Sequence, residues 1–134
     1  MVETEVLSKL PLFTSLDEAG LKQVAAWFEL RDVSEGVELA GQGASGYNFF
    51  VLCDGCAEVT TSDATLATLG PGDFFGEGAM VGGGRRNASV VTTAPSQVLV
   101  MFGTEFRRLQ QLHPDVAARI EAVARERGES VVGD

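Results

Sequence analysis

At 134 residues, the chain has the length of one domain, and that length suffices for a hydrophobic core without disulfide or metal staples. Hydrophobic residues make up 45% of the sequence, which excludes wholesale disorder, and no apolar run reaches the roughly 18 residues that a membrane-spanning helix needs. The net charge of −9 disfavours nonspecific attraction to nucleic acid. Residues 1–6 are acidic where a signal peptide is basic, so we expect a cytoplasmic protein with one domain over residues 1–134 and a core over about 7–127.

The N-terminal part of the chain predicts a helix followed by strands. Ser15 and Glu18 have the spacing of a capping box, and apolar residues then recur at helical intervals, so we expect a helix over about 16–28. Short segments rich in β-branched and aromatic residues follow, separated by turn-forming residues. The expected strands cover residues 30–33, 37–40, 47–53, 56–61, 65–69, 88–93 and 97–102.

The C-terminal part returns to helix. Thr104 is expected to cap a helix that carries Phe106 and Leu109, and Pro114 suits the first position of a last helix that we expect to end at Gly128. The predicted fold is mainly β with flanking helices: an eight-stranded jelly-roll β-barrel (double-stranded β-helix) with an N-terminal helix and two C-terminal helices. The last helix has an apolar seam that could pair with a second copy, which leaves a homodimer open.

The two cysteines have the spacing of a CxxC motif, which redox pairs and zinc sites share. Zinc takes four ligands, and besides the cysteines and carboxylates the sequence supplies only His113. Between Cys53 and Cys56 stands Asp54-Gly55, a common two-residue hairpin turn. We therefore favour a turn that pairs the flanking strands, and we predict no metal site.

The stretch over residues 70–90 concentrates glycine around one carboxylate and one pair of guanidiniums. Glycine lets backbone N–H groups approach a ligand closely, and consecutive N–H groups form a concavity that binds anions. Arg85 and Arg86 add charged forks that suit phosphate oxygens, and Glu77 is an acceptor that suits sugar hydroxyls. A phosphate clamp beside a hydroxyl acceptor predicts a nucleotide site.

Two other nucleotide-binding patterns and a catalytic pattern lack support. Gly76-Glu-Gly78 is not a dinucleotide fingerprint, because Val81 stands where a third small residue is needed. No Gly-Lys-Ser/Thr follows the glycines, which excludes an ATP-binding P-loop. The only histidine, His113, lies outside this stretch and is expected to cap a helix or lie on the surface. A nucleophile triad therefore has no support, and we expect no enzyme and no catalytic residues.

With the order of elements in place, the glycine-rich stretch resembles the phosphate-binding cassette of the cyclic nucleotide-binding domain family. This family includes catabolite-activator regulators, protein kinase A regulatory subunits and cyclic nucleotide-gated channels. The resemblance rests on Phe75-Gly-Glu-Gly-Ala-Met80 and Arg85-Arg-Asn-Ala-Ser-Val90, and on the nine-residue step from Glu77 to Arg86. Three further segments are similar to the family's motifs: Leu10–Phe13, Asn48–Val59 and Leu69–Phe74.

The resemblance implies a regulatory module that binds cAMP or cGMP, with no other cofactor, and passes its signal through the C-terminal helix to an attached effector domain. In the family's pattern, Arg86 clamps the exocyclic phosphate oxygens and Glu77 accepts the ribose 2′-hydroxyl. Main-chain N–H groups complete the cradle. Nine residues are expected to line the site: Phe75, Gly76, Glu77, Gly78, Ala79, Arg86, Asn87, Ala88 and Ser89.

The cassette also departs from the family's pattern. Gly78 replaces the usual leucine or isoleucine, which costs its short helix about 1 kcal/mol in propensity, and Arg85 replaces the usual proline. Residues 82–84 are three glycines, and ordering them costs about 1–2 kcal/mol per residue. Two alternatives therefore stay open: a degenerate member that binds no nucleotide and acts as an interaction or dimerisation domain, and the sensor fragment of a larger transcription factor or effector. Nothing after residue 128 predicts a helix-turn-helix, so we expect no direct nucleic-acid partner. The lack of a long apolar run likewise leads us to expect no membrane partner.

Overall fold

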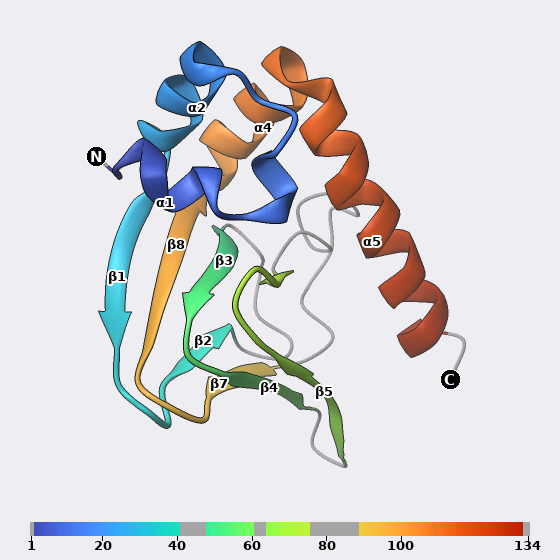
Figure 1. The fold of residues 1–134 in the computed structure, drawn as a ribbon. Coiled ribbons are helices and arrows are strands. Elements are labelled where there is room, and N and C mark those ends of the chain that lie inside the picture. Colours follow the sequence, from blue (N-terminus) through green and yellow to red (C-terminus); the bar gives the residue numbers. More distant parts are fainter. Residues whose placement is uncertain (1, 41–47, 61–63, 76–88, 133–134) are drawn as a thin grey trace.

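The computed structural model describes residues 2–40, 48–60, 64–75 and 89–132, and within them helices precede and follow the strands. The strands are β1 (Glu29–Val33), β2 (Glu38–Ala40), β3 (Asn48–Asp54), β4 (Ala57–Thr60), β5 (Thr65–Leu69), β6 (Phe74–Phe75), β7 (Ser89–Thr92) and β8 (Ser96–Phe102). The helices are α1 (Thr4–Ser8), the 3₁₀ helix η1 (Pro11–Phe13), α2 (Glu18–Ala25), α4 (Gly103–Leu112) and α5 (Pro114–Val132). Figure 1 shows α1, α2 and α4 gathered at one end of the strands, while α5 runs down one side.

The strands form two four-stranded antiparallel sheets, in the orders β1-β8-β3-β6 and β2-β7-β4-β5. The prediction of a mainly β fold with flanking helices is confirmed. The prediction of one closed barrel is wrong, because the described strands hydrogen-bond within two separate sheets. Each described strand lies in the opposite sheet from the strand before it, except β5, which pairs with β4. The connections thus carry the chain from one sheet to the other, and none of the strand pairs in the described part of the chain closes a ring.

The turn between β3 and β4 shows how the chain changes sheets. The predicted hairpin across Asp54-Gly55 is wrong, because β3 pairs with β8 and β6 while β4 pairs with β5 and β7. Gly55 has a φ of 97°, in the left-handed region that favours glycine. A Cβ there would collide with Ser96 Oγ and would lie 2.7 Å from the Pro95 carbonyl oxygen. Only glycine fits this crossing.

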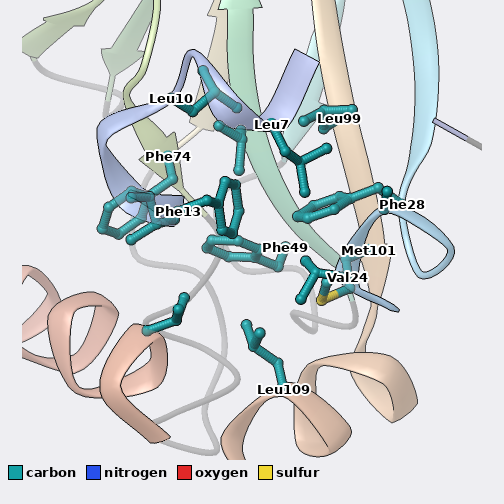
Figure 2. Close-up of a cluster of buried hydrophobic side chains, with 14 of the residues drawn as sticks. Leu7, Leu10, Phe13, Val24, Phe28, Phe49, Phe74, Leu99, Met101 and Leu109 are labelled. Atoms are coloured by element: carbon teal, nitrogen blue, oxygen red, sulfur yellow. The ribbon is translucent and has the colours of Figure 1, made fainter. Parts of the chain in front are cut away.

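Strand β3 is buried on both faces, which explains its nearly continuous apolar sequence. One face contributes to a helix-side cluster between the first sheet and the helices (Figure 2), which includes Leu7, Phe13, Val24, Phe28, Phe49, Val51, Phe74, Leu99, Met101, Phe106, Leu109, Val116 and Ile120. The other face contributes to an inter-sheet cluster, which comprises Phe50, Leu52, Ala57, Leu69, Phe75, Val90, Val98 and Val100. The first sheet is therefore the middle layer of the domain.

Both predicted helix caps are wrong. Asp17, not Ser15, caps α2, because the Asp17 carboxylate accepts the Gly20 N–H at 2.7 Å while the Ser15 hydroxyl is bonded elsewhere. Thr104 lies inside α4, whose N-cap is Phe102, and its hydroxyl donates to the neighbouring carboxylate of Glu105 at 2.6 Å. At α2 a tertiary bond to Asp115 takes the Ser15 hydroxyl, and at α4 a local bond to Glu105 takes the Thr104 hydroxyl.

The last helix begins at Pro114 as predicted but continues through Gly128 to Val132. An interior glycine costs a helix about 1 kcal/mol relative to alanine, which weakens the helix without ending it. The first two turns of α5 are anchored by Val116 and Ile120, both fully buried in the helix-side cluster. The prediction that α5 ends at Gly128 is therefore wrong.

Candidate functional site

The structure describes the two ends of the predicted site. Phe75 ends β6 and Ser89 begins β7. The other seven predicted site residues lie outside the described residues: Gly76, Glu77, Gly78, Ala79, Arg86, Asn87 and Ala88. Phe75 and Ser89, with the strands and the turn around them, form the frame of the predicted site.

The N-terminal end of this segment is fixed by an aromatic pair. Phe75 is only 4% exposed and lies opposite Phe50 in the register of β6 and β3. Their rings are stacked, with centroids 4.8 Å apart and planes inclined by 11°. Such a pair adds roughly 0.5–1.5 kcal/mol beyond the burial of its area. Because β6 is only two residues long, this packing supplies much of what holds it.

The C-terminal end of the segment is fixed in the other sheet. Ser89 lies opposite Thr60 in the pairing of β7 with β4, and the next residue, Val90, is buried in the inter-sheet cluster. Phe75 belongs to the same cluster, so one hydrophobic cluster anchors both ends of residues 76–88. A ligand that contacted both ends would thereby contact both sheets.

A tight turn over residues 70–73 leads into β6. The Asp73 carboxylate accepts the Gly70 N–H at 2.8 Å, and the Asp73 N–H donates to the Gly70 carbonyl oxygen at 3.1 Å. The turn is also bonded to β3, because the Gly72 N–H donates to the Leu52 carbonyl oxygen at 2.7 Å and the Leu52 N–H donates to the Asp73 carbonyl oxygen at 2.8 Å. Gly72 has a φ of 93°, which favours glycine. The approach to the segment is thus rigidly placed.

The face of β6 opposite Phe75 connects the frame to the helices. Phe74 packs in the helix-side cluster, where its ring lies 5.7 Å from that of Phe49 (Figure 2). Phe49 in turn lies 5.2 Å from Phe106 of α4. The same cluster contains Phe13 of η1 and Ile120 of α5. A displacement of β6 would therefore change the packing of the N-terminal and the C-terminal helices.

The remaining candidate groups lie outside this frame. Cys53 and Cys56 are free thiols, and burial, with a smaller contribution from the charge of Asp54, raises the pKa of Cys53 to about 11. Cys53 is therefore a protonated, poorly reactive thiol at neutral pH. His113 is the C-cap of α4, as predicted, and its Nε2 is hydrogen-bonded to Gln23 Oε1 at 2.7 Å.

No group of three or more His, Cys, Asp or Glu side chains in the described part of the chain could hold a metal ion. Among the helices that the structure describes, none is long and apolar enough to cross a membrane.

Comparison with known sequences and structures identifies the family of the chain. Residues 30–113 match the sequence profile of the family described as "Cyclic nucleotide-binding domain". The chain belongs to this family. The resemblance drawn from the cassette motifs is thus confirmed, and the match includes every residue predicted to line the site.

Individual relatives agree with the family assignment. The chain is 30% identical over 123 residues to a cyclic nucleotide-gated potassium channel of Rhizobium etli. The aligned region covers 92% of this chain and 34% of the channel. The catabolite activator protein of Thermus thermophilus has a TM-score of 0.77 and 29% identity, covering 87% of this chain and 57% of that chain. The regulatory domain of Toxoplasma gondii PKA, solved with cAMP, has the same fold, with a TM-score of 0.82 at 22% identity, covering 92% of this chain and 48% of that chain. The chain spans about a third of the length of the channel relative.

Sequence reasoning missed the elements that frame the site. Strand β6 was not predicted, because two residues are too few to show periodicity. Asp73 was not recognised as the residue that closes the turn before it. The composition Gly70-Pro-Gly-Asp73 is typical of a turn and could have indicated this role.

Proposed function

We propose that this domain binds a cyclic purine mononucleotide, cAMP or cGMP, and acts as a regulatory sensor without catalysis of its own. The observation that carries the proposal is the family match over residues 30–113, which spans the cassette. The frame agrees with it, since residues 76–88 connect a strand of one sheet to a strand of the other, and Phe75 before them and Val90 after them lie in one hydrophobic cluster. One segment, residues 76–88, can then contact both the phosphate and the ribose of the ligand.

Within this proposal, Arg86 clamps the phosphate and Glu77 accepts the ribose 2′-hydroxyl. A guanidinium offers a planar pair of donors to phosphate oxygens, and a carboxylate can only accept, which suits a hydroxyl. Backbone N–H groups among the neighbouring small residues complete the anion site. The signal passes to α5, which packs in the same hydrophobic cluster as β6.

Calorimetric titration of cAMP and cGMP into the domain and its arginine variants tests these roles. Arg86→Ala should weaken binding by roughly 2–5 kcal/mol, since a buried charged partner loses its counterpart. Arg86→Lys should also lose substantial affinity, because lysine cannot form the bidentate fork. Arg85→Ala removes the same charge one residue away and serves as the matched control. Unchanged affinity in Arg86→Ala would refute the role of Arg86.

A second candidate is a family member that binds no nucleotide and acts as an interaction domain. The sequence feature that favours it is the looseness of the cassette at Gly78 and residues 82–84. A ligand that binds only the folded state raises the melting temperature, and at 100 times Kd the gain is about 2.7 kcal/mol. The absence of any thermal shift at millimolar cAMP and cGMP would favour this second candidate over the sensor.

We further propose that an effector domain is attached to this one. The support is that the channel relative is about three times as long as the matched region. A competition assay of cAMP against cGMP would assign the purine.

A further inference from the structure

Hydrogen bonds of Asp115 and Arg119 join the beginning of α5 to the chain before α2. We call residues 11–17 the N-terminal strap. The Ser15 hydroxyl donates to Asp115 Oδ2 at 2.6 Å, and this bond is the main cause that lowers the pKa of Asp115. One turn further along α5, Arg119 Nη1 donates to the Pro11 carbonyl oxygen at 3.4 Å and to Thr14 Oγ1 at 3.3 Å. The strap thus contacts the first two turns of α5.

The other side of the strap contacts the approach to the proposed ligand segment. Pro11 Cδ lies 3.6 Å from the point where a Cβ on Gly72 would stand, so the proline ring faces the turn that precedes β6. Phe13 of the strap and Phe74 of β6 share the helix-side cluster, and Figure 2 shows their side chains on the same side of Phe49. The strap therefore lies between α5 and β6.

This arrangement matters because β6 is short, so that beyond the hydrogen bonds of the preceding turn to Leu52 its placement relies on side-chain packing. The strand has two residues, and its register with β3 consists of two pairs. Its position, and hence that of residue 76 onward, depends on packing from both sides. The inter-sheet cluster supports one side, and the strap supports the other.

We propose that Ser15 and Arg119 are positioning residues: they hold the strap against the Gly72 turn and thereby couple the placement of α5 to nucleotide affinity. This inference rests on the proposed function. Neither residue touches the ligand. Each acts through Pro11 and the turn, so its loss should weaken binding without abolishing it.

The test measures cAMP and cGMP affinity by calorimetry, and amide hydrogen exchange of strap and α5 peptides with and without nucleotide. Ser15→Ala and Arg119→Ala should each weaken affinity about three- to tenfold, the range expected for the loss of one hydrogen-bonded contact. Nucleotide-induced changes in exchange over residues 114–123 should shrink in both variants. Ser15→Thr keeps the hydroxyl and should restore both readouts.

Matched controls separate this role from a general loss of stability. Ser8→Ala removes a hydroxyl that donates only locally, to the Glu5 carbonyl oxygen, and Arg108→Ala removes an exposed guanidinium of α4. Both controls should leave affinity within twofold of the unchanged chain. If Arg119→Ala fails to fold, Thr14→Val removes one of its acceptors instead and should weaken affinity in the same direction.

The outcomes are distinguishable. Binding by the unchanged chain with unaltered affinity and exchange in Ser15→Ala and Arg119→Ala would overturn the coupling alone. Absence of binding by the unchanged chain would overturn the proposed function and the coupling with it. Weaker affinity together with altered exchange in α5, and neither effect in the controls, would support both.

Discussion

Truncation of Phe75 is the most direct test of how the site is framed. Its ring is almost fully buried and stacked on Phe50, at the last described position before the proposed ligand segment. Phenylalanine-to-alanine changes in cores cost about 3–5 kcal/mol, which includes the transfer of the ring and the cavity left behind. Against a total stability of about 5–15 kcal/mol, the Phe75→Ala domain should remain folded but be clearly destabilised.

The same substitution should weaken nucleotide binding. Without the stacked pair, the end of β6 is released, and binding must then order one or more additional residues at about 1–2 kcal/mol each. We therefore expect affinity for cAMP or cGMP to fall about five- to thirtyfold for each such residue. Urea unfolding measures the first effect, and calorimetric titration measures the second.

A matched control is available in Phe102, which is 50% exposed at the end of β8. Phe102→Ala should change stability by no more than about 0.5 kcal/mol, as surface substitutions usually do. A loss of less than about 1 kcal/mol in Phe75→Ala would refute the argument from burial. A loss of about the expected 3–5 kcal/mol in the free energy of unfolding, with unchanged affinity for the nucleotide, would instead refute the argument that Phe75 frames the ligand segment.

Two further predictions concern the crossing between the sheets and its cysteines. In urea unfolding, Gly55→Ala should destabilise the domain by at least about 2 kcal/mol, because the new Cβ adds a steric clash to the strain of a left-handed backbone. Gly36 has a φ of 83° with open space around it, so Gly36→Ala should cost only the backbone strain, about 1–2 kcal/mol. Equal losses in the two variants would contradict the clash at Gly55. Burial raises the pKa of Cys53 from 9.0 to about 11, so iodoacetamide at pH 8 should label the exposed Cys56 first; preferential labelling of Cys53, read by mass spectrometry, would contradict this. The contribution of the protonated Cys53 thiol to the free energy of unfolding should be present below pH 9 and lost as the pH rises through about 11.

The sequence predicted the order of elements and the family well, because these depend on local signals. Apolar spacing located α2, and β-branched runs located strands such as β3 and β8 within one or two residues. The partners of each strand could not be predicted. A strand buried on both faces loses the alternation that would indicate which side faces which sheet, and Asp54-Gly55 looks like a hairpin turn whether or not its strands pair.

The candidate site was predictable in chemistry rather than in geometry. The types and spacing of Glu77 and Arg86 indicated a nucleotide, and these residues remain predictions because they lie outside the described residues. The contacts of Ser15 and Arg119 could not have been predicted, since each joins positions about a hundred residues apart. Such contacts leave no periodic trace in the sequence.

The central place of β8 in the first sheet bears on how the protein folds. Strand β8 is the last strand of the chain, yet it pairs with both β1 and β3, so that Glu29 meets Val100 and Asn48 meets Phe102. Topologies dominated by such distant pairings fold slowly, in about milliseconds to seconds, because the entropy cost of closing long loops precedes the stabilisation that the contacts provide. During synthesis, β1 must wait unpaired, and β3 must wait without its β8 partner, until residue 102 has left the ribosome, and the strap and α5 can meet only after that.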